Sequence, residues 1–162
     1  MKEDAEINLI KDIQALPGKY QSTVTKIMGL ISAPFHCKLY TLIVLILYFL
    51  KKVSTSQVFI LCSSQFIIFT IKYIVKRKRP YEANKDIKLL EKMNFDPYSF
   101  PSGHTLNAIL LSVILKKNIN INLSIVPYLV GLSRVYLGVH YPSDILGGIL
   151  LSKIILYMYK FH

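Results

Sequence analysis

Three short polar clusters interrupt an otherwise apolar chain, and their residue types suit one chemistry. Each cluster lies at the end of an apolar run; they are Lys72 with Arg79-Pro80, then Pro101-Ser102-Gly103-His104, then Ser133-Arg134 with His140 and Asp144. Together they supply two histidines, one carboxylate and three cations. This set suits attack on a phosphate ester without a metal ion, because cations can neutralise phosphate oxygens while an imidazole attacks phosphorus.

Arginine is scarce in this chain, which makes its placement informative. Only three arginines occur beside 17 lysines, and two of them, Arg79 and Arg134, fall within the clusters. Arginine binds phosphate in a planar, bidentate geometry that lysine does not offer. Arg79 could equally be an interfacial anchor within the basic run 76–79. Arg134 and Lys72 lie near the ends of apolar spans, where a charge is costly and usually functional.

The second and third clusters each precede a predicted helix. Ser102 is a typical N-cap, and free N–H groups at a helix N-terminus can bind an anion that Gly103 allows to approach closely. Asp144 follows His140 by four residues. It either caps the last helix or holds the imidazole in one tautomer. A divalent metal ligated by His140 and Asp144 is disfavoured, because three nearby cations would repel it.

The apolar runs predict an all-α, integral-membrane helical bundle. Five runs are candidate spans, with a sixth left open: 39–50, which could extend back to about Phe35, then 56–75, 105–115, 121–139 and 145–159. Several are shorter than the roughly 20 residues that a bilayer core requires, so polar flanks or local thinning must compensate. The chain is expected to form a single domain over 1–162, with residues 35–162 as the catalytic bundle.

Residues 1–34 carry two amphipathic stretches that we expect to form helices at the membrane interface. The first places Leu9, Ile10, Ile13 and Leu16 on one face and ends at Pro17-Gly18; the second stops near Pro34. The long polar connection 77–101 is interpreted as a surface loop that could also act as a lid, with a hint of a short helix around Ile87, Leu90 and Met93.

The order of the spans brings the three clusters to one membrane face. The loops at 51–52 and 116–117 fall on one side, and the segments carrying the clusters fall on the other. The first side carries four lysines in short loops without acids, which favours the cytoplasm. We therefore expect a multi-pass protein of the cell (inner) membrane with its site on the extracytoplasmic face.

Composition narrows the possible partners. The chain is 52% hydrophobic with a net charge of +11, and much of that charge lies at the ends of apolar runs. This distribution fits positive-inside loops and contacts with anionic lipid rather than nucleic acid. Cys37 and Cys62 show no metal-binding or redox spacing. The acidic N-terminus does not resemble a signal peptide.

The three clusters, with their order and spacing, resemble the motifs of the type 2 phosphatidic acid phosphatase family, PAP2. That family includes membrane lipid phosphatases and resembles the soluble vanadium haloperoxidases. The resemblance covers roughly residues 50–160, and every motif position is matched. The complete set is highly specific, whereas Pro-Ser-Gly-His alone would be weak.

The resemblance implies a role for each motif residue and requires no metal or other cofactor. His140 would attack phosphorus and form a phosphohistidine, Asp144 would orient it, and His104 would protonate the leaving alkoxide. The phosphate oxygens would be bound by Lys72, Arg79, Ser102, Gly103 and Arg134. Water would then release phosphate.

Other activities share these residues. A phosphotransferase would use the same intermediate, a haloperoxidase would bind vanadate, and a lipid-phosphate binder would not turn over. The partner expected is a phosphorylated lipid in a bilayer, such as phosphatidate, phosphatidylglycerophosphate, a polyprenyl diphosphate or lipid A. The sequence does not choose among these lipids or predict an oligomeric state. Headgroup contacts are expected from the 81–100 loop, at Tyr81, Lys85, Lys88, Lys92 and Tyr98.

Overall fold

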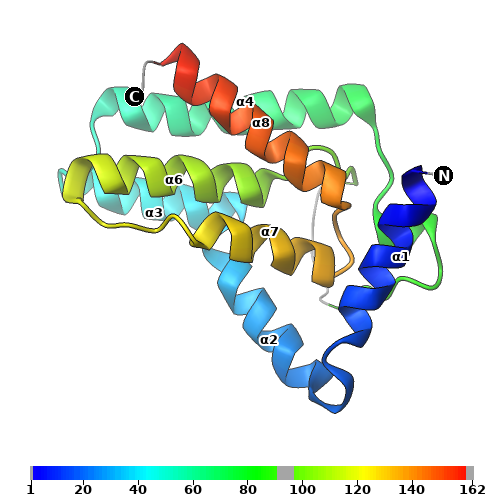
Figure 1. Ribbon diagram of the computed structural model, residues 1–162. Coiled ribbons are helices and arrows are strands. Elements are labelled where there is room, and N and C mark those ends of the chain that lie inside the picture. Colours follow the sequence, from blue (N-terminus) through cyan, green and yellow to red (C-terminus); the bar gives the residue numbers. More distant parts are fainter. Residues whose placement is uncertain (1, 91–96, 160–162) are drawn as a thin grey trace.

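The computed structural model describes residues 2–90 and 97–159, and within them the chain is helical without strands (Figure 1). The α-helices are α1 (Lys2–Ala15), α2 (Gln21–Ser32), α3 (Cys37–Phe49), α4 (Thr55–Val75), α5 (Pro80–Ala83), α6 (Gly103–Ile119), α7 (Val126–Tyr136) and α8 (Pro142–Met158). Short 3-10 turns, Gly18–Tyr20 and Ala33–Phe35, flank α2. The all-α prediction is confirmed, and each predicted apolar run contains a helix.

Helix α6 forms the centre of the bundle and packs against α3, α4, α7 and α8. Leu106, Ala108 and Leu111 are buried although they point in different directions from the helix axis, so this helix is apolar on more than one face. Such a helix belongs in the core, because surface helices keep one polar face. Its position matters for the site, since His104 lies in its first turn.

Local capping explains where helices α4 and α6, which carry site residues, begin and end. Helix α4 starts with a reciprocal capping box between Ser54 and Gln57 and stops at Lys76, which adopts the left-handed conformation at φ +52°. Helix α6 starts behind the N-cap Ser102 and ends at Asn120, also left-handed at φ +57°. The end of α4 and the start of α6 therefore lie at the same end of the bundle as the polar clusters (Figure 1).

The N-terminal helices pack on the bundle, and the predicted apolar face of α1 is only partly right. Ile10 is fully buried and Gln14 nearly so, whereas Leu9 and Leu16 are 47% and 81% exposed. Ile10 joins a small core with Ile87, which draws α1 toward the 84–90 loop and α7. The interfacial placement of these helices stays a prediction.

Helix length alone supports fewer spans than the apolar runs suggest. Of the described segments, Thr55–Ala83, which contains α4, is by itself long and apolar enough to cross a membrane, with a mean hydropathy of 1.9. The pair Gly18–Phe35 and Cys37–Phe49 qualifies only when taken together, bent by 52°. The count of five spans therefore stays a prediction.

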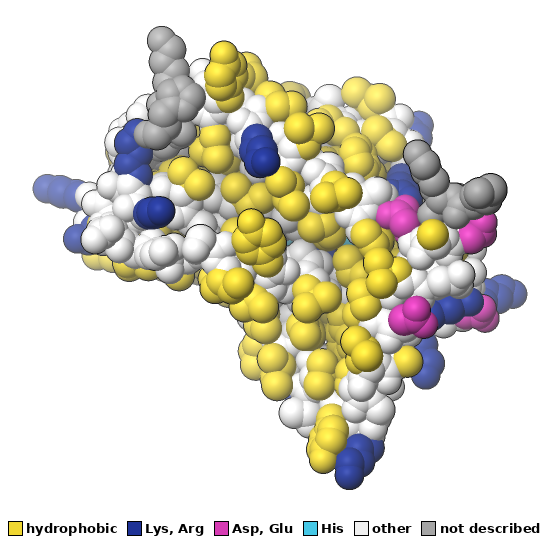
Figure 2. All heavy atoms as spheres, viewed as in Figure 1, with side chains coloured by type: hydrophobic (Ala, Val, Ile, Leu, Met, Phe, Trp, Pro, Cys, Tyr) yellow, Lys and Arg dark blue, Asp and Glu magenta, His cyan; other side chains and the backbone are white. Residues whose placement is uncertain are grey.

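Figure 2 shows where a lipid environment would fit. Apolar side chains gather over the middle of the face in view, and most Lys, Arg, Asp and Glu side chains lie toward its ends. Exposed members of the apolar set include Leu129, Leu132, Leu146 and Leu150 on α7 and α8. An apolar surface of this kind is typical of membrane contact.

Residues 84–90 do not form the suggested helix. This segment runs as turns and extended backbone, with Ile87 buried and the Leu90 N–H donating to the carbonyl of Leu137. The Gln14 side chain bonds both the N–H and the C=O of Lys88, which satisfies backbone groups that a helix would have paired. Lys92 and Met93 lie outside the described residues.

Candidate active site

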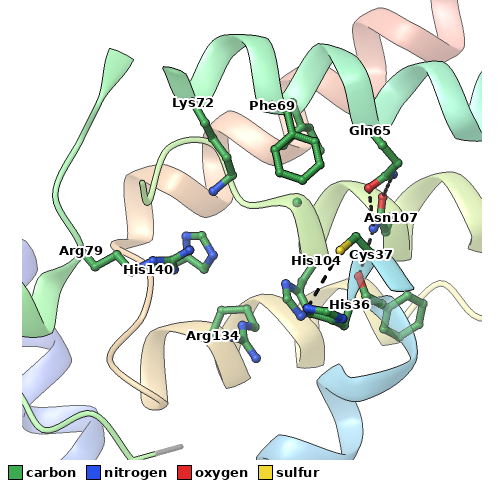
Figure 3. Close-up of a pocket in the computed structure, with 13 residues that line it drawn as sticks. His36, Cys37, Gln65, Phe69, Lys72, Arg79, His104, Asn107, Arg134 and His140 are labelled. Atoms are coloured by element: carbon green, nitrogen blue, oxygen red, sulfur yellow. Dashed lines mark hydrogen bonds between the residues drawn. The ribbon is translucent and has the colours of Figure 1, made fainter. Parts of the chain in front are cut away.

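The three clusters meet at one cavity of about 50 Å³ (Figure 3). A water molecule needs about 10–15 Å³ measured this way, so the cavity has room for a phosphoryl group and little more. Six predicted site residues line it, namely Lys72, Arg79, Gly103, His104, Arg134 and His140. The predicted convergence of the clusters on one end of the bundle is confirmed.

Three cations converge on this cavity, each held by a bond that aims it. Lys72 Nζ donates to the Tyr98 carbonyl at 2.6 Å, and Arg79 Nη1 donates to the Val139 carbonyl at 2.9 Å. Arg134 is fully buried, and its Nη1 donates to Ser32 Oγ at 2.8 Å. No Asp or Glu is among the described residues that line the cavity. Concentrated positive charge without a lining carboxylate suits an anion and disfavours a divalent metal.

His140 and Asp144 form the predicted histidine–carboxylate pair. Nδ1 of His140 lies 3.4 Å from Oδ2 of Asp144, and both side chains are buried. The same carboxylate oxygen accepts the Tyr141 N–H at 2.9 Å, which anchors it at the start of α8. The imidazole also bonds the Ser99 backbone, so the His140 ring is held from two directions.

The turn before His140 explains how α7 presents this imidazole. Helix α7 ends at Tyr136, and Gly138 adopts φ +77°, a conformation that glycine accepts without cost. The N–H groups of Val139 and His140 both point back to the Arg134 carbonyl at 3.3 Å. The turn therefore places Arg134 and His140 on the same cavity.

Ser102 and Gly103, at the start of α6, differ in whether they line the cavity. Ser102 is fully buried; its Oγ accepts the Thr105 N–H at 3.4 Å, and it does not line the cavity. Its own N–H donates to the Asp144 carbonyl, which ties the start of α6 to α8. Gly103 does line the cavity. A phosphate contact from Ser102 stays a prediction.

His104 and His140 line the cavity at different places along it. In Figure 3, Lys72, Arg79 and His140 lie on one side, His104 lies further along, and His36 lies beside His104. The rings of His36 and His104 are 5.9 Å apart between centroids. His104 thus lies in the same cavity as a group that His140 could attack. Burial and the charge of Arg134 lower the pKa of His104 well below its ordinary value of 6.5. Its role as a proton donor therefore depends on the negative charge of a bound phosphate, which favours the imidazolium.

Electrostatics favour the neutral, nucleophilic form of His140. Burial lowers the pKa of His140 well below its ordinary value of 6.5, and the charges of Arg79, Lys72 and Arg134 lower it further. Desolvation and like charge both disfavour the imidazolium. His140 is therefore unprotonated at neutral pH and able to attack.

Sequence reasoning missed Arg77, which it treated as part of a basic anchor. Arg77 Nη1 donates to Asp144 Oδ1 at 2.7 Å and to Ser143 Oγ at 2.6 Å, and Nη2 donates to Glu6 at 2.9 Å. The scarcity of arginine, already used for Arg79 and Arg134, was the signal that could have identified it. Glu6 and Ser32 carried no comparable signal, because only the packing of the N-terminal region brings them to the site.

Comparison with known proteins identifies the family. The family model described as the PAP2 superfamily matches residues 54–162. The chain belongs to the PAP2 superfamily. The match contains all three clusters, so the resemblance inferred from their spacing is confirmed. Residues 1–53, including α1 and α2, lie outside the matched region.

Named relatives are similar over part of their length. Phosphatidylglycerophosphatase B of Bacillus subtilis (strain 168) is 36% identical over 77 residues, 39% of this chain and 38% of the relative. An undecaprenyl-diphosphatase of Sulfolobus acidocaldarius is 40% identical over 86 residues, 51% of this chain and 41% of the relative. The chain thus spans about two fifths of the length of these curated relatives.

The fold is similar over nearly the whole PAP2 chain. A transmembrane PAP2-type phosphatidylglycerolphosphate phosphatase from Bacillus subtilis superposes with a TM-score of 0.77 at 26% identity. The superposition covers 98% of this chain and 84% of that one. It therefore includes the N-terminal helices that the family model does not match.

Proposed function

We propose that this chain is a metal-independent membrane lipid phosphatase that works through a phosphohistidine. The observation that carries the proposal is the cavity in which His140, backed by Asp144, shares one phosphoryl-sized space with His104 and three cations. The names of the similar proteins, phosphatases of phosphatidylglycerophosphate and undecaprenyl diphosphate, support the same reaction class.

The reaction divides into two displacements at phosphorus. In the first, Nε2 of His140 forms a bond to phosphorus as the bond to the leaving oxygen breaks, and His104 gives that oxygen a proton. In the second, water attacks phosphorus, His104 takes a proton from it, and the phosphorus–nitrogen bond breaks to release phosphate. Asp144 stabilises the positive charge that His140 carries in the intermediate.

The cations supply most of the transition-state stabilisation. Lys72, Arg79 and Arg134 are each nine-tenths or more buried, so their charges act on the phosphoryl oxygens with little screening by water. Their positions are set before substrate arrives by bonds to Tyr98, Val139 and Ser32. Little reorganisation is then needed during the reaction.

The size of the cavity places the rest of the lipid outside it. Because about 50 Å³ holds only the phosphoryl group, the remainder of the headgroup must lie outside the cavity, beside the lining residue Phe69. Phe69 is 39% exposed and offers an apolar surface to a lipid chain. We include both phosphomonoesters and diphosphates of membrane lipids as substrates.

The membrane placement belongs to this proposal. We infer a multi-pass protein of the cell membrane with the cavity facing the extracytoplasmic side, because the opposite end carries the acid-free loops with Lys51, Lys52, Lys116 and Lys117. A cysteine introduced for the exposed Lys85, in a chain with Cys37 and Cys62 replaced, should react with an impermeant thiol reagent in intact cells. Labelling only after lysis would reverse the orientation.

The activity is tested by phosphate release from the detergent-purified protein. Phosphatidylglycerophosphate, phosphatidate and undecaprenyl diphosphate are supplied separately, each with and without EDTA. We expect release from at least one lipid, unchanged by EDTA and lost in His140→Ala. Activity that EDTA abolishes, or that His140→Ala retains, contradicts the mechanism.

A further inference from the structure

Helix α1 reaches the active site through a charged network centred on Arg77. Glu6 Oε2 accepts Arg77 Nη2 at 2.9 Å, and Arg77 Nη1 donates to Asp144 Oδ1 at 2.7 Å. Glu6 also accepts the Ser143 N–H at 2.6 Å and the Ser143 hydroxyl at 3.0 Å. The network therefore holds the first turn of α8 from two directions.

Each link in this network is partly or fully shielded from water. The side chains of Glu6 and Arg77 are 19% and 25% exposed, and Asp144 is not exposed at all. The Arg77 guanidinium also lies 3.8 Å from the centroid of the Tyr141 ring, which fixes its plane. An arginine held by two carboxylates and an aromatic face does not behave as an interfacial anchor.

The two oxygens of Asp144 have different partners. Oδ1 accepts Arg77, whereas Oδ2 faces Nδ1 of His140 and accepts the Tyr141 N–H. A carboxylate held at Oδ1 by Arg77 and at Oδ2 by the Tyr141 N–H can rotate little, so Arg77 helps to set the direction in which Oδ2 meets the imidazole. The charge of Arg77 also offsets part of the negative charge that Asp144 presents to His140.

We propose that Glu6 and Arg77 are positioning residues for the nucleophile, so that the N-terminal helix sets both the orientation of His140 and its affinity for a proton. Glu6 lies outside the region that the family model matches. This inference rests on the proposed phosphatase activity. It makes α1 part of the catalytic apparatus, with Arg77 as the link between α1 and Asp144.

Removing the positive charge of Arg77 and removing the negative charge of Glu6 should shift the proton affinity of His140 in opposite directions. The groups that face His140 are Asp144 with negative charge, Lys72, Arg79 and Arg134 with positive charge, and His104. Arg77→Gln leaves the Asp144 charge without this partner, which favours the imidazolium. Glu6→Gln removes a negative charge and leaves Asp144 as the one carboxylate of this network that Arg77 bonds. This change disfavours the imidazolium of His140.

The experiment measures kcat/KM against pH in the detergent-purified full chain. For Arg77→Gln we expect kcat/KM to fall at least tenfold. We also expect the acid limb of its pH profile, where activity is lost as the pH falls, to shift upward by about 0.5–1 pH unit. For Glu6→Gln we expect a smaller loss of kcat/KM and an acid limb that moves downward. Arg77→Lys keeps the positive charge but lacks the planar, bidentate guanidinium. It should return the acid limb to its original pH but restore only part of kcat/KM.

Matched controls remove the same charges nearby. Lys78→Gln lies one residue from Arg77, and Asp12→Asn lies on α1; both side chains are exposed. Neither should move the acid limb. An Arg77→Gln limb equal to that of the unmodified protein, a shift as large in Lys78→Gln, or a Glu6→Gln limb that stays in place or moves upward would overturn the proposal.

A second measurement separates this inference from the phosphatase activity itself. NMR titration of histidine-labelled protein, with the His140 signal assigned by its loss in His140→Gln, reads the proton affinity of His140 without turnover. The same opposite shifts are expected there. If no lipid is hydrolysed yet the shifts appear, the positioning network stands and the proposed function fails; absent shifts with active enzyme contradict the network alone.

Discussion

Replacing Gly138 by alanine should destabilise the protein and displace the nucleophile. A Cβ at this position would lie 2.4 Å from the Lys88 carbonyl oxygen, about 1 Å short of ordinary contact at 3.4 Å. The Lys88 backbone cannot readily withdraw, because Gln14 bonds both its N–H and its C=O. Gly138 also has φ +77°, which an L-residue with a side chain rarely adopts.

The magnitude follows from these two costs. Left-handed backbone costs about 1–2 kcal/mol for a residue with a Cβ, and an overpacked contact adds about 1–3 kcal/mol. Gly18→Ala is the matched control, because Gly18 has φ +48° but nothing within 4 Å of its Cβ. It should therefore lose only the backbone contribution.

The assay is thermal unfolding followed by far-ultraviolet circular dichroism in one detergent. At about 2–4 °C per kcal/mol for a chain of this size, Gly138→Ala should lower Tm by about 5–15 °C and Gly18→Ala by about 2–8 °C. Phosphate release should fall in the first variant, because Gly138 lies two residues before His140. Equal losses of stability in the two variants would refute the clash with Lys88.

Three further predictions concern the site. Because burial and Arg79 lower the pKa of His140, its neutral form persists below pH 6.5, so the acid limb of kcat/KM should lie below that value; a limb above it would contradict the assignment. Ser32→Ala removes the hydroxyl that accepts Arg134 and should reduce kcat/KM by about tenfold, measured beside the exposed-site variant Ser22→Ala. In Gly148→Ala, the new Cβ would lie 2.7 Å from the Ser102 carbonyl, so Tm should fall by the equivalent of about 1–3 kcal/mol, as read by circular dichroism; an unchanged Tm would mean that α8 withdraws freely.

Much of the site was predictable because its residues are local signals at helix ends. Lys72 and Arg79 fall at the end of an apolar run, and the Pro-Ser-Gly-His sequence opens another. Chain order alone then placed these ends on one side of the bundle, since successive antiparallel helices alternate direction. Scarcity of arginine and histidine in a lysine-rich chain further separated Arg134 and His140 from the background.

The N-terminal region was harder to predict, because its contacts are distant in sequence. Periodicity indicated a helix over 5–16, and α1 covers it, but the face that packs was only partly right. Gln14 and Glu6 are polar residues that periodicity assigns to solvent, yet they bond residues 74 and 137 positions away. Such bonds depend on where two elements dock, which neither propensity nor hydrophobic pattern describes.

The sequence by itself determined the main helices and the family, and it predicted a reaction class, because motif spacing and apolar period are properties of short segments. Only the tertiary structure decided how charge is distributed around the nucleophile. Arg77 and Lys78 are adjacent basic residues with the same local context, yet one bonds Asp144 and Glu6 and the other is exposed. The difference arises from the docking of α1 and α8 on the loop after α4, which places carboxylates on one side of that loop alone.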